Sequence, residues 1–90
     1  MSDSPSTDVT VVIPCLNEAE SLPAVLKAMP PGYRALVVDN NSTDDTAAVA
    51  RAHGAEVVLE TRAGYGAAVH AGVVASSTRV VAVLDGDGSL

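Results

Sequence analysis

The sequence is poor in large aromatic side chains. It contains no Phe and no Trp, and Tyr33 and Tyr65 are its only aromatic residues, although 48% of its 90 residues are apolar. A hydrophobic core must therefore be built from Val, Ala, Leu and Ile, which excludes a core with large anchoring side chains. A chain of this length forms one small domain with a modest core.

Basic residues and cysteines are also scarce. The five Lys and Arg residues are scattered, and the formal net charge is -6. Because binding to a phosphate backbone needs clustered cations, we expect no nucleic-acid partner. Cys15 is the only cysteine, which excludes an internal disulfide and, without a Cys/His cluster, argues against a zinc site. No apolar run has the length of a membrane span or signal peptide core, and we expect a cytoplasmic protein.

What the sequence does contain is a series of short apolar runs. Residues 9–13, 35–38, 56–59 and 80–84 are rich in Val and predict strands, and the last run predicts a strand buried on both faces. Apolar residues at helical spacing lie between them. The segments that connect these runs are too long for hairpins, so they predict a parallel sheet with right-handed crossovers and helices on both faces. We therefore expect an α/β fold, a doubly wound, mostly parallel βαβαβαβ half-domain.

Boundary signals support this order of elements. Asn17 or Ser21 is suited to cap the first helix, and Ser42 with Asp45 forms a capping-box pattern before the second. Gly64-Tyr65-Gly66 opens the third. We expect residues 1–8 to form a disordered head and residues 9–90 to form the domain.

A polar cluster follows each predicted strand. The clusters are residues 14–18, 39–42, 62–66 and 85–87. In open parallel sheets, ligands bind outside the carboxyl ends of the strands. The four clusters therefore predict one site at one edge of the sheet.

Two of these clusters suit a nucleoside. Asp39 can accept hydrogen bonds from a base N–H or from ribose hydroxyls, or it can simply terminate its strand. Asn17 and Glu18 can face the same nucleoside, or serve only at the start of a helix.

The other two clusters suit a diphosphate and a metal ion. Arg62 can pair with a diphosphate or stay solvated, while Gly64 and Gly66 allow phosphate to approach a helix N-terminus closely. Asp85 and Asp87 follow the last strand with one glycine between them. Such closely spaced carboxylates are natural ligands of a hard divalent cation.

The order and spacing of these stretches resemble the N-terminal, nucleotide-binding half of a family 2 glycosyltransferase of the GT-A, Rossmann-like fold. The branch that looks most similar is the polyprenyl-phosphate sugar transferases. The stretches are Val11–Pro14 with Asn17 and Glu18, Val37–Asp44, Gly64–Ala68 and Asp85–Asp87.

The resemblance implies a nucleotide-diphospho-sugar donor, linked to UDP or GDP, with Mg²⁺ or Mn²⁺ held at its diphosphate by the Asp-x-Asp motif. It also implies inverting transfer to an acceptor such as a polyprenyl phosphate or another glycan precursor. The candidate donor-binding residues are Pro14, Asn17, Glu18, Asp39, Asn41, Ser42, Arg62, Gly64, Gly66 and Asp85, and the candidate metal ligands are Asp85 and Asp87.

In the family, the catalytic base and the acceptor site lie beyond this motif. We therefore expect the base downstream of Leu90, expect a parent protein that is longer and associates with the cytoplasmic face of a membrane, and expect little transferase activity from the chain alone. The strand over residues 80–84 is then expected to present an open edge that can self-associate.

Two alternatives remain. The stretch Leu84–Leu90 also looks like the nucleophile motif of haloacid-dehalogenase-type phosphatases, with Asp85 attacking phosphorus and Asp87 as acid/base. The chain can also be a nucleotide-binding or remnant domain without turnover. A phosphoenzyme on Asp85 would favour the first alternative, and absence of any nucleotide binding would favour a structural remnant.

Overall fold

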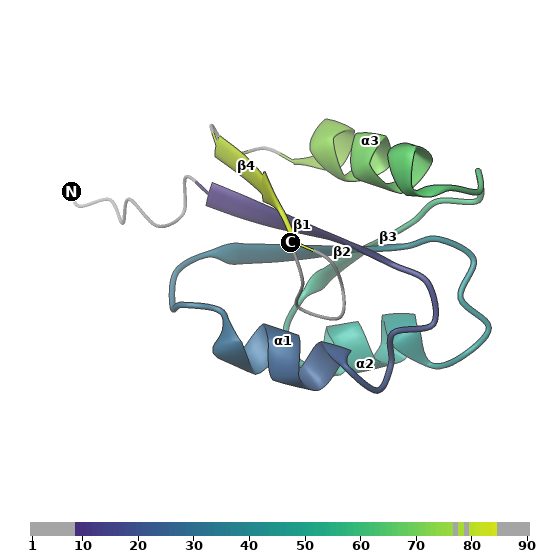
Figure 1. Cartoon of the computed structure of the whole chain (residues 1–90). Coiled ribbons are helices and arrows are strands. Elements are labelled where there is room, and N and C mark those ends of the chain that lie inside the picture. The colour runs from purple at the N-terminus through teal and green to yellow at the C-terminus, as the bar shows by residue number, and fades with distance from the viewer. Residues whose placement is uncertain (1–8, 77, 79, 85–90) are drawn as a thin grey trace.

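The computed structural model describes residues 9–76, 78 and 80–84, which form a parallel sheet between two helical layers (Figure 1). Residues 1–8, Asp85 and Asp87 lie outside this part of the chain. The strands, in the order β3-β2-β1-β4, are β1 (Val9–Cys15), β2 (Arg34–Asp39), β3 (Glu56–Leu59) and β4 (Val80–Val83). The helices are α1 (Leu22–Ala28), α2 (Thr46–Ala52) and α3 (Tyr65–Ala75). The predicted doubly wound βαβαβαβ arrangement is confirmed.

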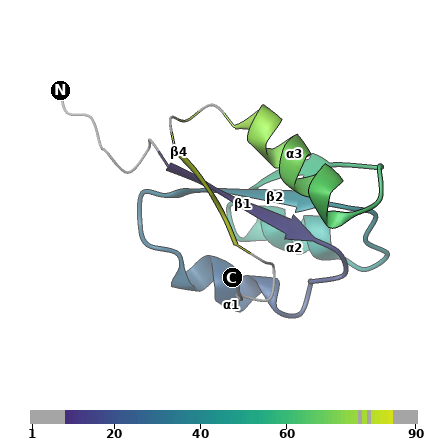
Figure 2. The same cartoon turned by 45° about the horizontal axis from the view of Figure 1, so that its top comes forward.

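The helices divide between the two faces of the sheet. Helices α1 and α2 lie on one face and α3 lies on the other, where it packs on β1 and β2 (Figures 1 and 2). The chain moves outward from β1 to β3 and then returns through α3 to place β4 on the other side of β1. The strand order therefore reverses beside β1, which is where open α/β sheets bind ligands. None of the described helices is long and apolar enough to cross a membrane.

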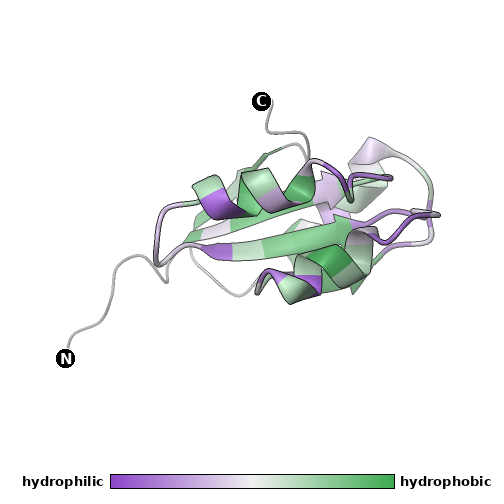
Figure 3. Cartoon of the chain, turned by 90° about the horizontal axis from the view of Figure 1, so that it is seen from below, coloured by the Kyte–Doolittle hydropathy of each residue, from purple (hydrophilic) through white to green (hydrophobic). Residues whose placement is uncertain are grey.

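The core has two parts because successive strand residues point to opposite faces. Figure 3 shows hydrophobic strands and helix faces, with hydrophilic loops at the carboxyl end of the sheet. The cluster beneath α1 and α2 comprises Val11, Ile13, Cys15, Leu22, Val37, Ala50 and Ala55, and the cluster beneath α3 comprises Val12, Leu36, Val38 and Ala68.

The prediction that the last strand is buried on both faces is wrong. Strand β4 pairs with β1 at the edge of the described sheet, and its residues alternate between exposed and half-buried. Val80 is 51% exposed. A run of valines indicates a strand, but it does not reveal whether a neighbouring strand and two helical layers cover it.

The predicted capping box is also wrong. Asp45 stands at the N-cap of α2 without a side-chain capping bond, and the Ser42 hydroxyl accepts a hydrogen bond from the backbone of Asn17 instead. Ser21 stands at the N-cap of α1, also without a side-chain capping bond, and its hydroxyl donates to Glu18. The hydroxyls of Ser42 and Ser21 therefore bond to Asn17 and Glu18, in the loop between β1 and α1.

Gly72 allows α3 to lie close to the sheet. A Cβ atom at this position would overlap one methyl group of Val12 and would lie 3.1 Å from the other Val12 methyl and from a Val38 methyl. These neighbours are buried in the sheet, at 0% exposure each, and have little room to move.

We predict that Gly72→Ala lowers the free energy of unfolding by about 1–3 kcal/mol, because the added methyl group overpacks the contact between α3 and the sheet. Urea unfolding followed by circular dichroism measures this change. Gly66→Ala, in the same helix, is the matched control. No atom lies within 4 Å of a Cβ at Gly66, so this variant should be neutral or more stable by up to about 1 kcal/mol. Equal stability of both variants would contradict the close packing.

Candidate functional site

The carboxyl ends of three strands are level. Cys15 of β1 pairs in register with Asp39 of β2, and Asp39 pairs with Leu59 of β3. Backbone hydrogen bonds extend this pairing by one residue past Asp39 and Leu59. The Asn40 N–H donates to the Cys15 carbonyl (2.9 Å), and the Glu60 N–H donates to the Asp39 carbonyl (3.0 Å). The loops that follow the three strands therefore begin side by side.

Asp39 lies at the centre of this edge. It is 9% exposed, and its Oδ1 accepts a hydrogen bond from the Ser42 N–H at 3.0 Å. The carboxylate therefore closes the turn after β2, as the simpler interpretation expected. A carboxylate offers about four acceptor positions, so this bond leaves it able to accept from a ligand. Pro14 is buried within β1, which runs one residue further to Cys15.

The loop after β1 is fixed to the loop after β2. The Asn17 side-chain oxygen accepts the N–H groups of Thr43 (2.8 Å) and Asp44 (3.2 Å), while the Asn17 N–H donates to the Ser42 hydroxyl (2.9 Å). Asn17 also adopts a left-handed backbone conformation, with φ of 58°. The Asn17 amide oxygen thus holds the loop after β1 against the loop after β2. Contact between Asn17 and a nucleoside stays a prediction.

Sequence reasoning missed Asp44 and Thr46, which complete this junction. Asp44 Oδ1 accepts both the hydroxyl and the N–H of Thr46, and its Oδ2 accepts the Ala19 N–H at 3.2 Å. The buried Thr46 hydroxyl accepts the Glu18 N–H at 3.0 Å. The Thr46 hydroxyl is the main cause that lowers the pKa of Asp44 below its ordinary value. The dense run of Asn, Asp, Ser and Thr over residues 39–46 was the available signal.

Two asparagines join the loop after β2 to the loop after β3. Asn40 is 7% exposed, and its Nδ2 donates to the carbonyls of Glu60 (2.8 Å) and Arg62 (2.7 Å), while its Oδ1 accepts the Gly64 N–H (3.0 Å). The exposed Asn41, with φ of 69°, donates from Nδ2 to a carbonyl of the same loop. Sequence reasoning missed Asn40.

Arg62 already has an anionic partner. Its Nη2 lies 3.2 Å from Glu60 Oε1, and its Nε donates to Glu60 Oε2 at 3.3 Å. The hydrogen bond from the Arg62 side chain is the main cause that lowers the pKa of Glu60, and the same bond raises the pKa of Arg62. The Arg62 side chain is 68% exposed, so solvent screens the pair and a more highly charged anion can displace Glu60.

The two predicted phosphate-facing glycines lie at the start of α3. Gly64 is its N-cap residue, with φ of 114°, a conformation that favours glycine. Gly66 is exposed in the first turn.

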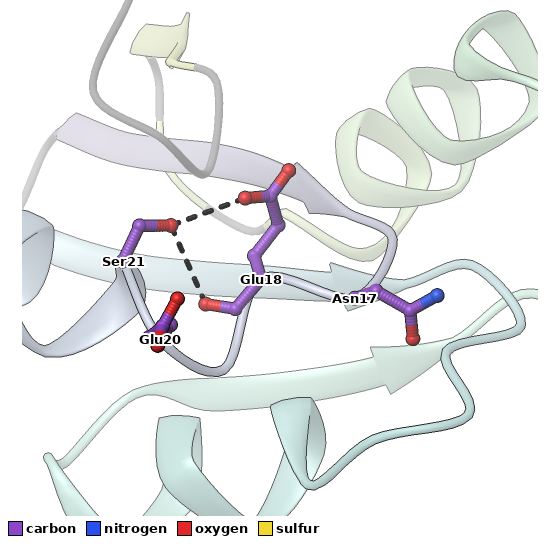
Figure 4. A pocket seen from close by; sticks show the side chains of 4 residues that line it. All are labelled: Asn17, Glu18, Glu20 and Ser21. Atoms are coloured by element: carbon purple, nitrogen blue, oxygen red, sulfur yellow. Dashed lines mark hydrogen bonds between the residues drawn. The ribbon is translucent and has the colours of Figure 1, made fainter.

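A hollow of about 310 Å³ opens beside the loop after β1 (Figure 4). It is lined by Asn17, Glu18, Glu20 and Ser21. The Ser21 hydroxyl bonds to the Glu18 carbonyl oxygen at 3.4 Å and to the Glu18 carboxylate at 3.1 Å. Because its lining is rich in acceptor oxygens and carries two carboxylates, the hollow suits N–H and O–H groups and disfavours phosphate.

The predicted metal ligands lie outside the described residues. Within the described part of the chain, no three His, Cys, Asp or Glu side chains are grouped to hold a metal ion. The Leu84 N–H donates to the Val12 carbonyl at 3.0 Å, so the chain still runs beside β1 one residue before Asp85. The Asp85 and Asp87 metal site stays a prediction.

A doubly wound parallel sheet, with polar loops gathered at its carboxyl edge beside a reversal of strand order, is typical of α/β proteins that bind nucleotides. The model of the family Glycosyl transferase family 2 matches residues 10–90, and the chain belongs to this family.

Relatives agree with this assignment. The chain is 74% identical over 82 residues to an uncharacterized glycosyltransferase of Mycobacterium tuberculosis (strain ATCC 25618 / H37Rv), a match that covers 91% of the chain and 38% of the relative. It is 34% identical over 110 residues to a dolichyl-phosphate beta-glucosyltransferase of Drosophila melanogaster, covering 99% of the chain and 33% of that protein.

Solved structures give the same fold. The chain superposes on glucosyl-3-phosphoglycerate synthase from Mycobacterium tuberculosis, in complex with Mn²⁺, UDP and glucosyl-3-phosphoglycerate, with a TM-score of 0.79 and 32% identity. The match covers 87% of the chain and 33% of the synthase. The predicted GT-A fold is confirmed, and the chain spans roughly a third of the length of these relatives. The haloacid-dehalogenase alternative gains no support, because its nucleophile motif usually follows a first strand, whereas Asp85 follows β4, the fourth strand of the described residues.

We predict that the stability contributed by Asp44 depends on pH. Because folding lowers the pKa of this carboxyl, its contribution is present above its ordinary pKa, near about pH 4, and is lost as the pH falls through the lower folded value. Asp44→Asn should therefore be less stable than the parent chain at about pH 7, and the difference should shrink below about pH 4. Urea unfolding at several pH values measures it.

Asp45→Asn provides the matched control, since it removes the same charge one residue away, where no side-chain capping bond exists. A stability difference between the parent chain and Asp44→Asn that stayed constant down to about pH 2 would contradict the role given to this carboxylate.

Proposed function

We propose that the chain is the donor-binding part of a metal-dependent glycosyltransferase that uses a UDP-linked sugar. The observation that carries the proposal is the position of Asp39, at the end of β2 and between the loops that follow β1 and β3. Family membership supports glycosyl transfer. The structures of glucosyl-3-phosphoglycerate synthase with UDP-glucose and Mn²⁺ support UDP as the nucleotide and a divalent cation as the cofactor.

The nucleoside is assigned to Asp39 and the loop after β1. Asp39 accepts from a base N–H or from ribose hydroxyls, and Glu18, on the neighbouring hollow, offers further acceptors. Asn41 and Ser42, in the turn that Asp39 closes, border the same region. This acceptor-rich surface suits the polar edge of a nucleoside better than its phosphates.

The diphosphate is assigned to the loop after β3 and to the Asp-x-Asp motif. On binding, Arg62 replaces its ion pair with Glu60 by one with a phosphate. Gly64 and Gly66 leave room for the diphosphate to approach the start of α3 closely. Asp85 and Asp87 would hold Mn²⁺ or Mg²⁺. When bound, this cation neutralises charge that develops on the leaving diphosphate.

The acceptor class is assigned from the relatives. The names dolichyl-phosphate beta-glucosyltransferase and glucosyl-3-phosphoglycerate synthase both describe transfer to a phosphorylated acceptor. We therefore assign a phosphorylated acceptor, of which polyprenyl phosphate is one case. Self-association along β4, at the edge of the described sheet, is also part of the proposal.

We predict that the chain binds UDP at least about tenfold more tightly with Mn²⁺ than without it, and that Asp87→Asn removes this dependence on metal. Isothermal titration of UDP and GDP, each with and without Mn²⁺, measures both effects and the choice of nucleotide.

Glu56→Gln is the control for loss of one negative charge, because Glu56 pairs with Arg34 at the amino end of the sheet. It should bind UDP and Mn²⁺ as the parent chain does. Absence of UDP binding, or binding that ignores the metal, would instead favour a remnant domain.

We predict that Asp39→Asn weakens UDP binding by about tenfold to a hundredfold, because a hydrogen bond to a charged acceptor is replaced by one to a neutral amide. The asparagine oxygen can still accept the Ser42 N–H, so the turn should persist. Titration of UDP with Mn²⁺ measures the loss, and urea unfolding checks the fold. An unchanged UDP affinity would remove Asp39 from the nucleoside site.

A further inference from the structure

The loop between β3 and α3, residues 60–64, is anchored mainly from one side chain. The register of β2 with β3 ends at Asp39 and Leu59, and one further backbone bond joins Glu60 to Asp39. Beyond that point, the Asn40 side chain bonds to the loop at both ends and in the middle, through Glu60, Arg62 and Gly64.

Both N–H donors and the oxygen of the Asn40 amide take part in these contacts. Both Nδ2 hydrogens donate to carbonyls at 2.8 and 2.7 Å, and Oδ1 accepts the Gly64 N–H at 3.0 Å. The side chain is nearly buried, so rotating the amide would leave buried polar groups unpaired. The loop therefore fixes the orientation of the Asn40 amide, and the amide in turn fixes the position of the loop.

The same residue is tied to the centre of the sheet. The Asn40 N–H donates to the Cys15 carbonyl at 2.9 Å, and Asn40 follows Asp39 directly. One residue thus connects the ends of β1 and β2 to the loop that carries Arg62 and Gly64.

We infer that Asn40 is a positioning residue for the donor, which sets the loop 60–64 at a fixed distance from Asp39. This inference rests on the proposed function, because Asp39 is assigned to the nucleoside and Arg62 and Gly64 to the diphosphate. When the loop is already ordered before binding, the binding free energy does not include the entropic cost of ordering it. Asn40 itself contacts no ligand in this arrangement and acts through the loop.

A neutral amide is required for this role. An aspartate would keep an acceptor for the Gly64 N–H, but it would lose both donors and place a carboxylate against the carbonyl oxygens of Glu60 and Arg62. Asn40→Asp therefore separates the Gly64 contact from the two carbonyl contacts without changing the shape of the side chain.

The test compares Asn40→Ala with the parent 90-residue chain in two measurements. UDP affinity in the presence of Mn²⁺ should fall by about tenfold, because the loop must now be ordered on binding. Hydrogen exchange of the Gly64 amide, followed by ¹⁵N NMR, should accelerate by about tenfold or more relative to the amides of β1, because its acceptor is gone.

Thr10→Val is the matched control. It removes the hydrogen bond that the buried Thr10 hydroxyl accepts from Thr78 at 2.7 Å. This bond lies near the amino end of β1, roughly 16 Å of strand away from Cys15. This variant should lose stability without losing UDP affinity. An Asn40→Ala affinity within twofold of both the parent chain and Thr10→Val would overturn the positioning role.

If Asn40→Ala does not fold, Asn40→Asp decides the question through the same titration. It should retain slow exchange at Gly64 and still bind UDP more weakly, and parent-like affinity would overturn the inference. Failure of the proposed function gives a different result, since the parent chain would then not bind UDP with Mn²⁺ at all. The Gly64 measurement still tests Asn40 when UDP does not bind. If hydrogen exchange at Gly64 in Asn40→Ala were then the same as in the unmutated chain, the role of Asn40 in setting the loop would be overturned.

Discussion

Three parallel strands end at the same level, and everything at the carboxyl edge depends on this register. Because Cys15, Asp39 and Leu59 are paired across the sheet, loops that are more than 20 residues apart in sequence begin within hydrogen-bonding reach of one another. The bond from Asn17 to Ser42 spans 25 residues, and the bond from Asn40 to Arg62 spans 22. A slip of one residue in either pairing would turn the core side chains to the wrong face and separate these partners.

The loops are joined chiefly through asparagine amides, which suits the charge of this edge. An amide both donates and accepts, so one side chain can bind backbone N–H and C=O groups at once without adding charge. Asn17 takes backbone N–H groups from the neighbouring loop, and Asn40 takes both kinds of group. The loops are thereby fixed while the carboxylate of Asp39 remains the charged group at the centre.

The strands, the helices and the convergence of polar loops could be predicted, because periodicity and strand direction are local properties. What could not be predicted is which polar side chain finds which partner. Ser42 and Asp45 match a capping box in sequence, yet Ser42 bonds to Asn17, because that loop lies closer once the strands are paired. Asn40 is one amide among several in the sequence, and only the register of β2 with β3 shows that it is buried. An open edge at residues 80–84 was expected, but the exposure of the β4 side chains was not, and it follows from the place of β4 at the edge of the described sheet.

The distribution of charge supports the proposal that donor binding requires a cation. The described Lys and Arg residues are Lys27, Arg34, Arg51 and Arg62. Lys27 and Arg51 lie in the last turns of α1 and α2, and Arg34 begins β2. Because crossover helices run opposite to parallel strands, the last turns of these helices lie near the amino ends of the strands. Three of the four cations therefore lie toward the amino edge of the sheet. Arg62 alone of this group lies at the carboxyl edge, and it already neutralises Glu60. Among the described residues, a diphosphate that approaches Asp39 and Glu18 therefore meets mainly negative charge, and the proposed divalent cation would offset that repulsion.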